Sequence, residues 1–272
     1  MQPTLASIRL YPLKSAAALE PERAVVEARG LAGDRRWMVV DAEGRFVTAR
    51  KHPRLLLIRA RFDGPGLVLD APDMSSLRLV AAAGQPRLGA TVWRDRVEAI
   101  VAEPQADAWI SRYLGFAARF AHMDAGVSRA VDPDYSQSGD EVSFADGFPL
   151  LLISAAALDA LNEKLATPVP MSRFRPNLVV AGVPAHAEDG WCSIRIGAIV
   201  FDVVKPCSRC VLTTVDPLRG EFDPGGEPLR TLTGYRRSAH GVTFGQNLIA
   251  RGAGPIAVGD ALEILDQDGR PT

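Results

Sequence analysis

The sequence predicts a mainly β protein with a few helices, of the β-barrel type within the α+β class. Short runs of alternating apolar and polar residues, bounded by Gly, Pro, Asp or Asn, recur in the first hundred residues and again after residue 177. Two segments between these regions have a helical period instead. With 272 residues, of which 47% are hydrophobic, the chain can form one large domain or two small ones.

The first half of the chain is expected to form short strands joined by tight turns. The residues from 36 to 49 have the pattern of a hairpin that turns at Asp41-Ala42-Glu43-Gly44. The remaining strands are predicted from the same alternation. They cover residues 5–10, 55–62, 67–70, 77–82 and 97–102.

The middle of the chain has a different pattern. Apolar residues at helical spacing predict an amphipathic helix over 103–116. Residues 124–145 are polar and irregular, which is typical of a long surface loop. The clearest helix is predicted over 153–165, with Ser154 as its N-cap. The change of pattern places a domain boundary near 118–122, which divides the chain into 1–120 and 121–272.

The second half returns to strands. Apolar, β-branched runs predict them at residues 177–182, 192–197, 198–204, 210–215 and 261–265. Cys192 and the tryptophans are expected to be structural, in strands, in the core or at the seam between domains. The tryptophans are Trp37, Trp93, Trp109 and Trp191.

Charge and cysteine content exclude several classes of protein. Lys and Arg total 31 against 32 Asp and Glu, so the sequence has no basic excess for nucleic acid. No apolar run approaches the length of a membrane span. Three cysteines in so long a chain do not form a disulfide framework. We expect a cytoplasmic monomer that binds neither nucleic acid nor membrane.

The segment from Lys205 to Cys210 contains a C-x-x-C pair, Cys207 and Cys210. Such a pair occurs in zinc sites, in dithiol redox sites and as two ordinary buried cysteines. The four histidines and Cys192 form no second pair with metal-ligand spacing, which disfavours zinc. The cations Lys205 and Arg209 favour the thiolate, which binds soft metal centres.

Three further segments could bind an anion. Lys14 and Ser15 follow the first predicted strand and could hold a phosphate, although a solvated loop has the same pattern. Arg35 follows Gly-x-x-Gly-Asp, which is also ordinary turn chemistry. Arg175 precedes a buried-looking strand, where it is either an anion clamp or a charge at the strand end.

These segments together resemble one family. YPLKS, GDRRW, FRPNLVV, KPCSRCVLTTVDP and FGQNLIA with GPIAVGDALEIL occur in this order, over nearly the whole chain. In this combination the sequence is similar to the MOSC family (molybdenum cofactor sulfurase C-terminal), in the two-part form with an N-terminal MOSC β-barrel module and a C-terminal MOSC domain. The resemblance is to the branch that contains the amidoxime-reducing proteins and their bacterial counterparts.

The resemblance implies a mononuclear molybdenum-molybdopterin cofactor with one pyranopterin dithiolene. It makes Cys210 the molybdenum ligand and leaves Cys207 without that role. It places a set of polar residues around the pterin and its phosphate, together with the loop 144–148. The implied contacts are Lys14, Ser15, Arg35, Gly147, Phe148, Arg175, Asn177, Ser208 and Arg209. Gly147 and Phe148 stand where relatives carry hydroxyl residues, so backbone contacts are expected there. Asp146 is expected to be a proton relay or a support for the site, the alternative being a turn aspartate.

The resemblance implies a molybdenum-dependent oxidoreductase that reduces small N-hydroxylated compounds to amines or amidines, with release of water. The cysteines do not suffice for an iron–sulfur cluster, and the sequence shows no N-terminal anchor. Electrons are therefore expected from a separate ferredoxin- or flavin-type protein. Tyr235 and His240 are expected near the mouth of the site. Two other functions stay open, a persulfide-handling protein and a non-catalytic carrier of the cofactor.

Overall fold

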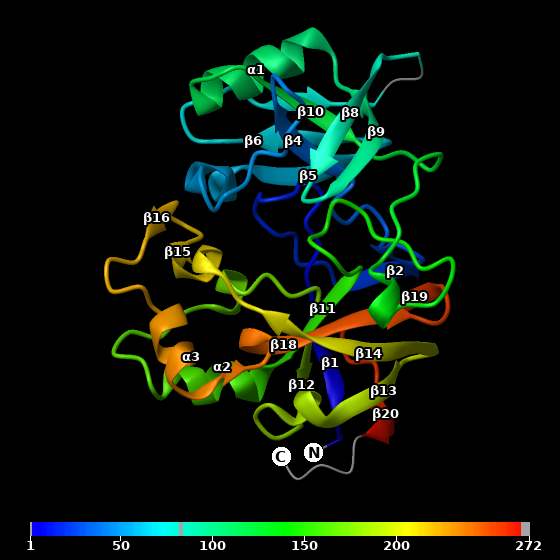
Figure 1. The fold of residues 1–272 in the computed structure, drawn as a ribbon, viewed down its shortest axis with the longest axis vertical. Helices are drawn as coiled ribbons and strands as arrows, with labels where there is room; N and C mark the ends of the chain where they lie inside the picture. The colour runs from blue at the N-terminus through cyan, green and yellow to red at the C-terminus, as the bar shows by residue number, and fades with distance from the viewer. Residues whose placement is uncertain (1, 82–83, 268–272) are drawn as a thin grey trace.

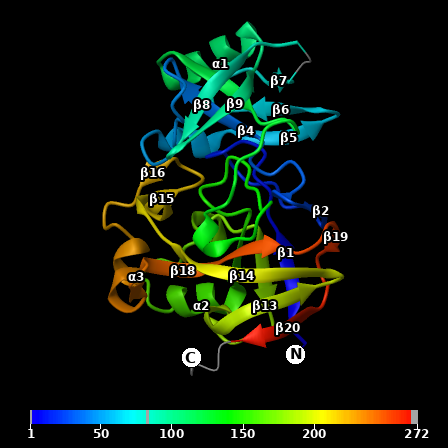
Figure 2. The same ribbon diagram turned by 45° about the vertical axis from the view of Figure 1, so that its right-hand side comes forward.

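The computed structural model describes residues 2–81 and 84–267, most of whose regular structure is in strands, with three α-helices. Figures 1 and 2 show an upper part, which contains the segments from β4 to β10, and a lower part built on one large sheet. The mainly β prediction is confirmed. Residue 82, the last of the predicted strand 77–82, lies outside the described residues.

The upper part is made of two small antiparallel sheets and one helix. The helix α1 (Pro104–Leu114) buries Trp109, Ile110 and Tyr113 against the strands and ends at Gly115, whose φ is 81°. A left-handed glycine is a common helix terminator. The strands of one sheet, in spatial order, are β4 (Trp37–Asp41), β10 (Ala118–His122), β9 (Asp95–Val101) and β8 (Arg87–Val92). Those of the other are β5 (Arg59–Asp63), β6 (Gly66–Asp70) and β7 (Leu77–Leu79).

The lower part is built on one curved sheet with its own apolar core. Its spatial order is β1 (Thr4–Ile8), β12 (Leu178–Ala181), β11 (Leu150–Ser154), β18 (Gly241–Ala250), β14 (Ile199–Ser208), β13 (Trp191–Ile196) and β20 (Leu262–Gln267), with β17 (Arg237–Ser238) paired to β18. The helices α2 (Ala155–Asn162) and α3 (Leu229–Tyr235) lie beside it. Small sheets join β19 (Gly254–Ala257) to β2 (Arg23–Glu27) and β3 (Gly30–Leu31), and β15 (Val215–Asp216) to β16 (Glu221–Phe222).

The two parts exchange chain segments. Strand β1 belongs to the lower sheet, where Thr4 pairs with Ala181, and the chain then rises into the upper part. It returns after β10, through the irregular segment that follows His122. The irregular backbone predicted over 124–145 is confirmed, with one short 3₁₀ turn at Pro133–Tyr135. Its predicted place at the surface is correct only in part, because Val142, Ser143 and Phe144 are buried. The division at residue 120 remains a prediction.

The strand predicted over 210–215 is wrong in most of its length. Strand β14 ends at Ser208, and Val211–Thr214 form a 3₁₀ helix, so that Val215 is the one residue of the predicted span that belongs to a strand. The hydroxyls of Thr213 and Thr214 donate to the carbonyl oxygens three residues earlier, at 2.9 and 2.8 Å. Such local bonds compete with a sheet ladder for the backbone, which β-branched composition alone does not reveal.

Two other predicted elements have different bounds. The strand predicted over 55–62 begins at Arg59, because Pro53 opens a 3₁₀ turn that extends to Leu57. The helix predicted from residue 153 begins at Ala155, since Ile153 belongs to β11, and it ends at Asn162. Ser154 is its N-cap as predicted, accepting a 3.2 Å hydrogen bond from the Ala157 N–H.

Candidate functional site

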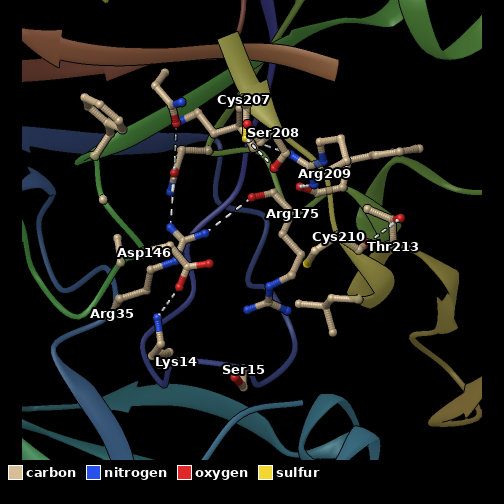
Figure 3. Close-up of a pocket in the computed structure, with 18 of the residues that line it drawn as sticks. Lys14, Ser15, Arg35, Asp146, Arg175, Cys207, Ser208, Arg209, Cys210 and Thr213 are labelled. Carbon is tan, nitrogen blue, oxygen red and sulfur yellow. Dashed lines mark hydrogen bonds and ion pairs between the residues drawn. The ribbon is translucent and has the colours of Figure 1, made fainter. Parts of the chain in front are cut away.

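All the residues that the sequence assigns to the cofactor site line one pocket between the upper and lower parts. Figure 3 shows most of them around it. They are Lys14, Ser15, Arg35, Asp146, Gly147, Phe148, Arg175, Asn177, Ser208, Arg209 and Cys210. They come from the segments after β1 and β3, before β11 and β12, and at the end of β14. Sites on the connections of a rigid sheet are typical of enzymes.

The pocket is strongly cationic. Six of its lining residues are basic, and Asp146 is its one acidic lining residue among those described. The basic residues are Lys14, Arg35, Arg50, Arg173, Arg175 and Arg209. The Nε atoms of Arg173 and Arg209 are buried without a hydrogen-bond partner in the described part of the chain. Buried donors without partners are rare, so these atoms fit a site that receives an anionic group.

Tyr11 orders two of these arginines. The guanidinium carbons of Arg35 and Arg175 lie 4.4 and 4.2 Å from its ring centre. The buried Tyr11 hydroxyl donates to the carbonyl of Pro176 over 3.1 Å. Burial lowers the pKa of Arg175 to about 10, although the guanidinium stays protonated at neutral pH. The ring thus keeps two cations together where their repulsion would otherwise separate them.

Three of the pocket residues have left-handed backbone. The φ angles of Ser15, Arg35 and Arg175 are 69°, 49° and 57°. This conformation is uncommon for residues other than Gly, Asn and Asp, and it persists where the surroundings impose it. The pocket therefore concentrates backbone strain, as binding and catalytic sites often do.

A chain of polar contacts links Lys14 to Cys210. The Lys14 ammonium donates to Asp146 Oδ1 at 2.5 Å and to the carbonyl of Phe144 at 2.6 Å. Arg50 donates from Nη2 to Asp146 Oδ2 at 2.8 Å and from Nε to Cys210 Sγ at 3.2 Å. One aspartate therefore joins a lysine and an arginine beside the thiol.

This contact chain changes two pKa values. Burial lowers the pKa of Lys14 to about 8, although the charge of Asp146 acts in the opposite direction. Burial alone would raise the pKa of Asp146, but the charges of Lys14 and Arg50 hold it well below its usual range. Asp146 is therefore an ionised acceptor at neutral pH, and Lys14 is the member of the pair whose proton exchanges near neutrality.

The two cysteines of the C-x-x-C pair have different surroundings. Arg209 donates from Nη1 to Cys207 Sγ at 3.0 Å and from Nη2 to the carbonyl of Phe174 at 2.6 Å. Cys207 and Cys210 are not joined by a disulfide, and Figure 3 shows Cys207 at the strand end and Cys210 lower in the pocket. Within residues 2–81 and 84–267, no three His, Cys, Asp or Glu side chains are arranged to hold a metal ion, which disfavours the zinc alternative.

Some predicted placements differ. Tyr235 and His240 do not line the pocket; Tyr235 packs against His186, with ring centres 6.0 Å apart. The His240 carbonyl accepts a 2.6 Å hydrogen bond from the hydroxyl of Ser208, so His240 adjoins a lining residue without lining the pocket itself. Trp37, Trp109 and Trp191 are buried as expected, whereas Trp93 is 45% exposed.

Sequence reasoning missed five polar lining residues. Arg50 lies in a turn without a motif, whereas Arg173 directly precedes the motif that begins at Phe174 and was overlooked there. The sequence has many more arginines than lysines, which is a general indication of further arginines at an anion site. The five are Thr48, Arg50, Arg173, Thr213 and Asn247.

Comparison with known proteins agrees with this architecture. Residues 2–117 match the MOSC N-terminal beta barrel domain, and residues 139–263 match the MOSC domain. Fold and pocket thus define a two-part MOSC protein, as the sequence motifs indicated. No helix in the described part of the chain is long and apolar enough to cross a membrane.

Curated relatives of similar sequence show which branch of the MOSC proteins this chain resembles. The chain is 36% identical over 286 residues to "Mitochondrial amidoxime-reducing component 1" of Homo sapiens, a match that covers 97% of this chain and 83% of that protein. It is 34% identical to the protein of the same name from Mus musculus and 33% identical to that from Xenopus laevis, with the same coverage. The chain belongs to the MOSC family of the amidoxime-reducing components.

Proposed function

We propose that this protein is a molybdenum-cofactor-dependent oxidoreductase that reduces small N-hydroxylated compounds to amines or amidines. The observation that carries the proposal is the cationic pocket lined by two free cysteines, of which Cys210 is in contact with Arg50. The names of the relatives, which describe amidoxime reduction, support the substrate class. Electrons would come from a separate ferredoxin- or flavin-type protein in the cytoplasm.

The residues present fit a molybdopterin with one dithiolene. A phosphorylated pterin is anionic. Among residues 2–81 and 84–267, the pocket offers six cations against one carboxylate, and the Nε atoms of two of its arginines have no partner. Cys210 is a soft donor suited to molybdenum. Lys14, Ser15, Arg35, Arg175, Ser208 and Arg209 would hold the phosphate and pterin, with Asn177 and the backbone of Gly147 and Phe148.

When bound, the cofactor supplies the two-electron chemistry that removes oxygen from the N–OH group. The protein orients the substrate and controls protons. Asp146 remains ionised and can accept an N–H of an amidine or hydroxylamine. Lys14, 2.5 Å away, holds a proton that can be passed toward the departing water. We thus extend the proton relay proposed for Asp146 to the pair Lys14–Asp146.

The test combines metal content with turnover. The protein is purified from a host that makes the pterin cofactor, together with Cys210→Ser and Cys207→Ser. Molybdenum and zinc are determined by elemental analysis, and reduction of an aryl amidoxime is measured with a reduced viologen dye. We expect about one molybdenum per chain in the wild type and in Cys207→Ser, and loss of metal and turnover in Cys210→Ser.

The other outcomes distinguish the alternatives. Full turnover in Cys210→Ser would contradict the proposal. Absence of molybdenum with sulfane sulfur on either cysteine would indicate a persulfide-handling protein. Bound cofactor without reduction of any N-hydroxylated compound would indicate a carrier.

A further inference from the structure

The turn between β8 and β9 has two features that folding alone does not favour. Trp93 at this turn has left-handed backbone, with φ 55°, and 45% of its surface is exposed. A bulky residue in this conformation is an outlier, and an exposed tryptophan contributes little to a core. Figures 1 and 2 show the hairpin running from the upper part toward the middle of the molecule.

Two of the contacts of Trp93 are made with pocket residues, Arg50 and Asp146. The guanidinium carbon of Arg50 lies 4.4 Å from its ring centre, and Phe46 packs on the ring at 4.9 Å. Its indole Nε1–H donates to Asp146 Oδ1 at 3.3 Å. The same side chain therefore orients both Arg50 and Asp146, the two groups next to Cys210 and Lys14.

The same turn also fixes the backbone that carries Asp146. Asp95, at the start of β9, accepts from Nε of the buried Arg129 at 2.6 Å. The other nitrogens of Arg129 donate to the carbonyls of Ser143, Ala145 and Asp146 at 2.9, 2.6 and 3.0 Å. Lys14 donates to the carbonyl of Phe144, which lies between these acceptors. The four consecutive carbonyls of residues 143–146 therefore accept hydrogen bonds from two cations, Lys14 and Arg129.

We propose that the Trp93–Asp95 turn of the upper part is a positioning element for the pocket. Trp93 sets the side chains of Arg50 and Asp146 against Cys210, and Asp95, through Arg129, sets the loop that carries Asp146. Trp93 is a positioning residue and need not touch the substrate. The inference rests on the proposed reductase function for its kinetic readout, whereas its structural readout is independent of that function.

Two variants separate the contacts of Trp93. Trp93→Phe keeps the ring on Arg50 and removes the N–H that Asp146 accepts. Trp93→Gly removes both contacts and relieves the left-handed backbone. Asp73→Gly is the matched control, because Asp73 also has left-handed φ, 62°, and is exposed outside the pocket.

The structural readout is the titration of the Asp146 carboxyl by ¹³C NMR in the cofactor-free protein. A carboxyl pKa rises when a hydrogen-bond donor to its charged form is lost. We therefore expect the pKa of Asp146 to rise in Trp93→Phe and Trp93→Gly, which both lack the indole N–H, and to stay unchanged in Asp73→Gly. The kinetic readout is kcat in the loaded enzyme. We expect kcat to fall about tenfold in Trp93→Gly with little change in KM, the size typical for loss of a group that orients a ligand.

The outcomes separate the two proposals. An unchanged Asp146 titration and unchanged kcat in both Trp93 variants would overturn the positioning role. A shifted titration in a protein that reduces no N-hydroxylated compound would support the positioning role and contradict the proposed function. A loss of activity in Asp73→Gly as large as that in Trp93→Gly would overturn the positioning role, because the effect would then follow from the change of backbone alone.

Discussion

The guanidinium of Arg50 donates from Nε to the Sγ of Cys210 across 3.2 Å, although the two residues are 160 positions apart in the chain. Arg50 belongs to the upper part. Cys210 lies two residues beyond Ser208, the last residue of strand β14 in the lower sheet. The surroundings of the Cys210 thiol are therefore completed by a residue from the other part. The geometry of the pocket at Cys210 depends on how the two parts are held together.

Arg50→Lys is expected to lower kcat about tenfold. Lysine has one nitrogen and cannot reach Cys210 and Asp146 together while stacking on Trp93, as the forked guanidinium does. Steady-state reduction of an amidoxime measures the effect. Arg54→Lys is the control, since Arg54 stacks on Tyr113 at 4.9 Å and does not line the pocket. Equal kinetics in both variants would show that Arg50 only contributes charge.

Arg129→Met is expected to destabilise the protein by roughly 3 kcal/mol, because it leaves Asp95 and three loop carbonyls without their buried donor. Urea denaturation measures the difference. Arg195→Met, which removes an exposed pair with Glu263, should cost less than about 1 kcal/mol. A loss no larger than that of Arg195→Met would mean that the loop does not depend on Arg129.

Lys14 should make stability rise with alkaline pH in the cofactor-free protein. Burial lowers its pKa to about 8 from the ordinary 10.5, so between these values the unfolded chain binds more protons than the folded one. The free energy of unfolding should therefore increase by about 3 kcal/mol across this window, relative to Lys14→Met. Denaturation at several pH values measures it, with the exposed Lys164→Met as control. Parallel curves for wild type and Lys14→Met would contradict the burial of a charged Lys14.

His122 should make stability fall in acid. Burial lowers its pKa to about 4 from 6.5, and its ring lies 4.6 Å from that of Trp37. Below pH 6.5 the unfolded chain binds the extra proton first, so the free energy of unfolding falls by about 3 kcal/mol as the pH drops to 4. His122→Phe should lack this slope, and the exposed His240→Phe should retain it. The prediction fails if both variants follow the wild-type curve.

The fold and the pocket were predictable to different degrees. Local alternation predicted the strand-rich class, and the residue types around Ser154 predicted the N-cap of the helix, because both depend on neighbouring residues. The motif around Cys210 indicated the pocket, yet it also led to a wrong strand over 210–215. There the threonine hydroxyls bind the backbone locally, which apolar periodicity does not register.

Contacts between distant segments could not be predicted from patterns. Arg50 lies in a turn without a motif, and its partners Trp93, Asp146 and Cys210 come from three other segments. The low pKa of Asp146 likewise depends on Lys14 and Arg50, which folding brings together. A single sequence carries the identities of these residues but not their distances.

The pairing of β1 with β12 has a consequence for synthesis of the chain. Thr4 leaves the ribosome 177 positions before its partner Ala181. At typical elongation rates of about 5–20 residues per second, β1 waits on the order of 10–30 s for its neighbour. The upper part can close during that interval, and the lower sheet, with its edge strand already tethered, is assembled last.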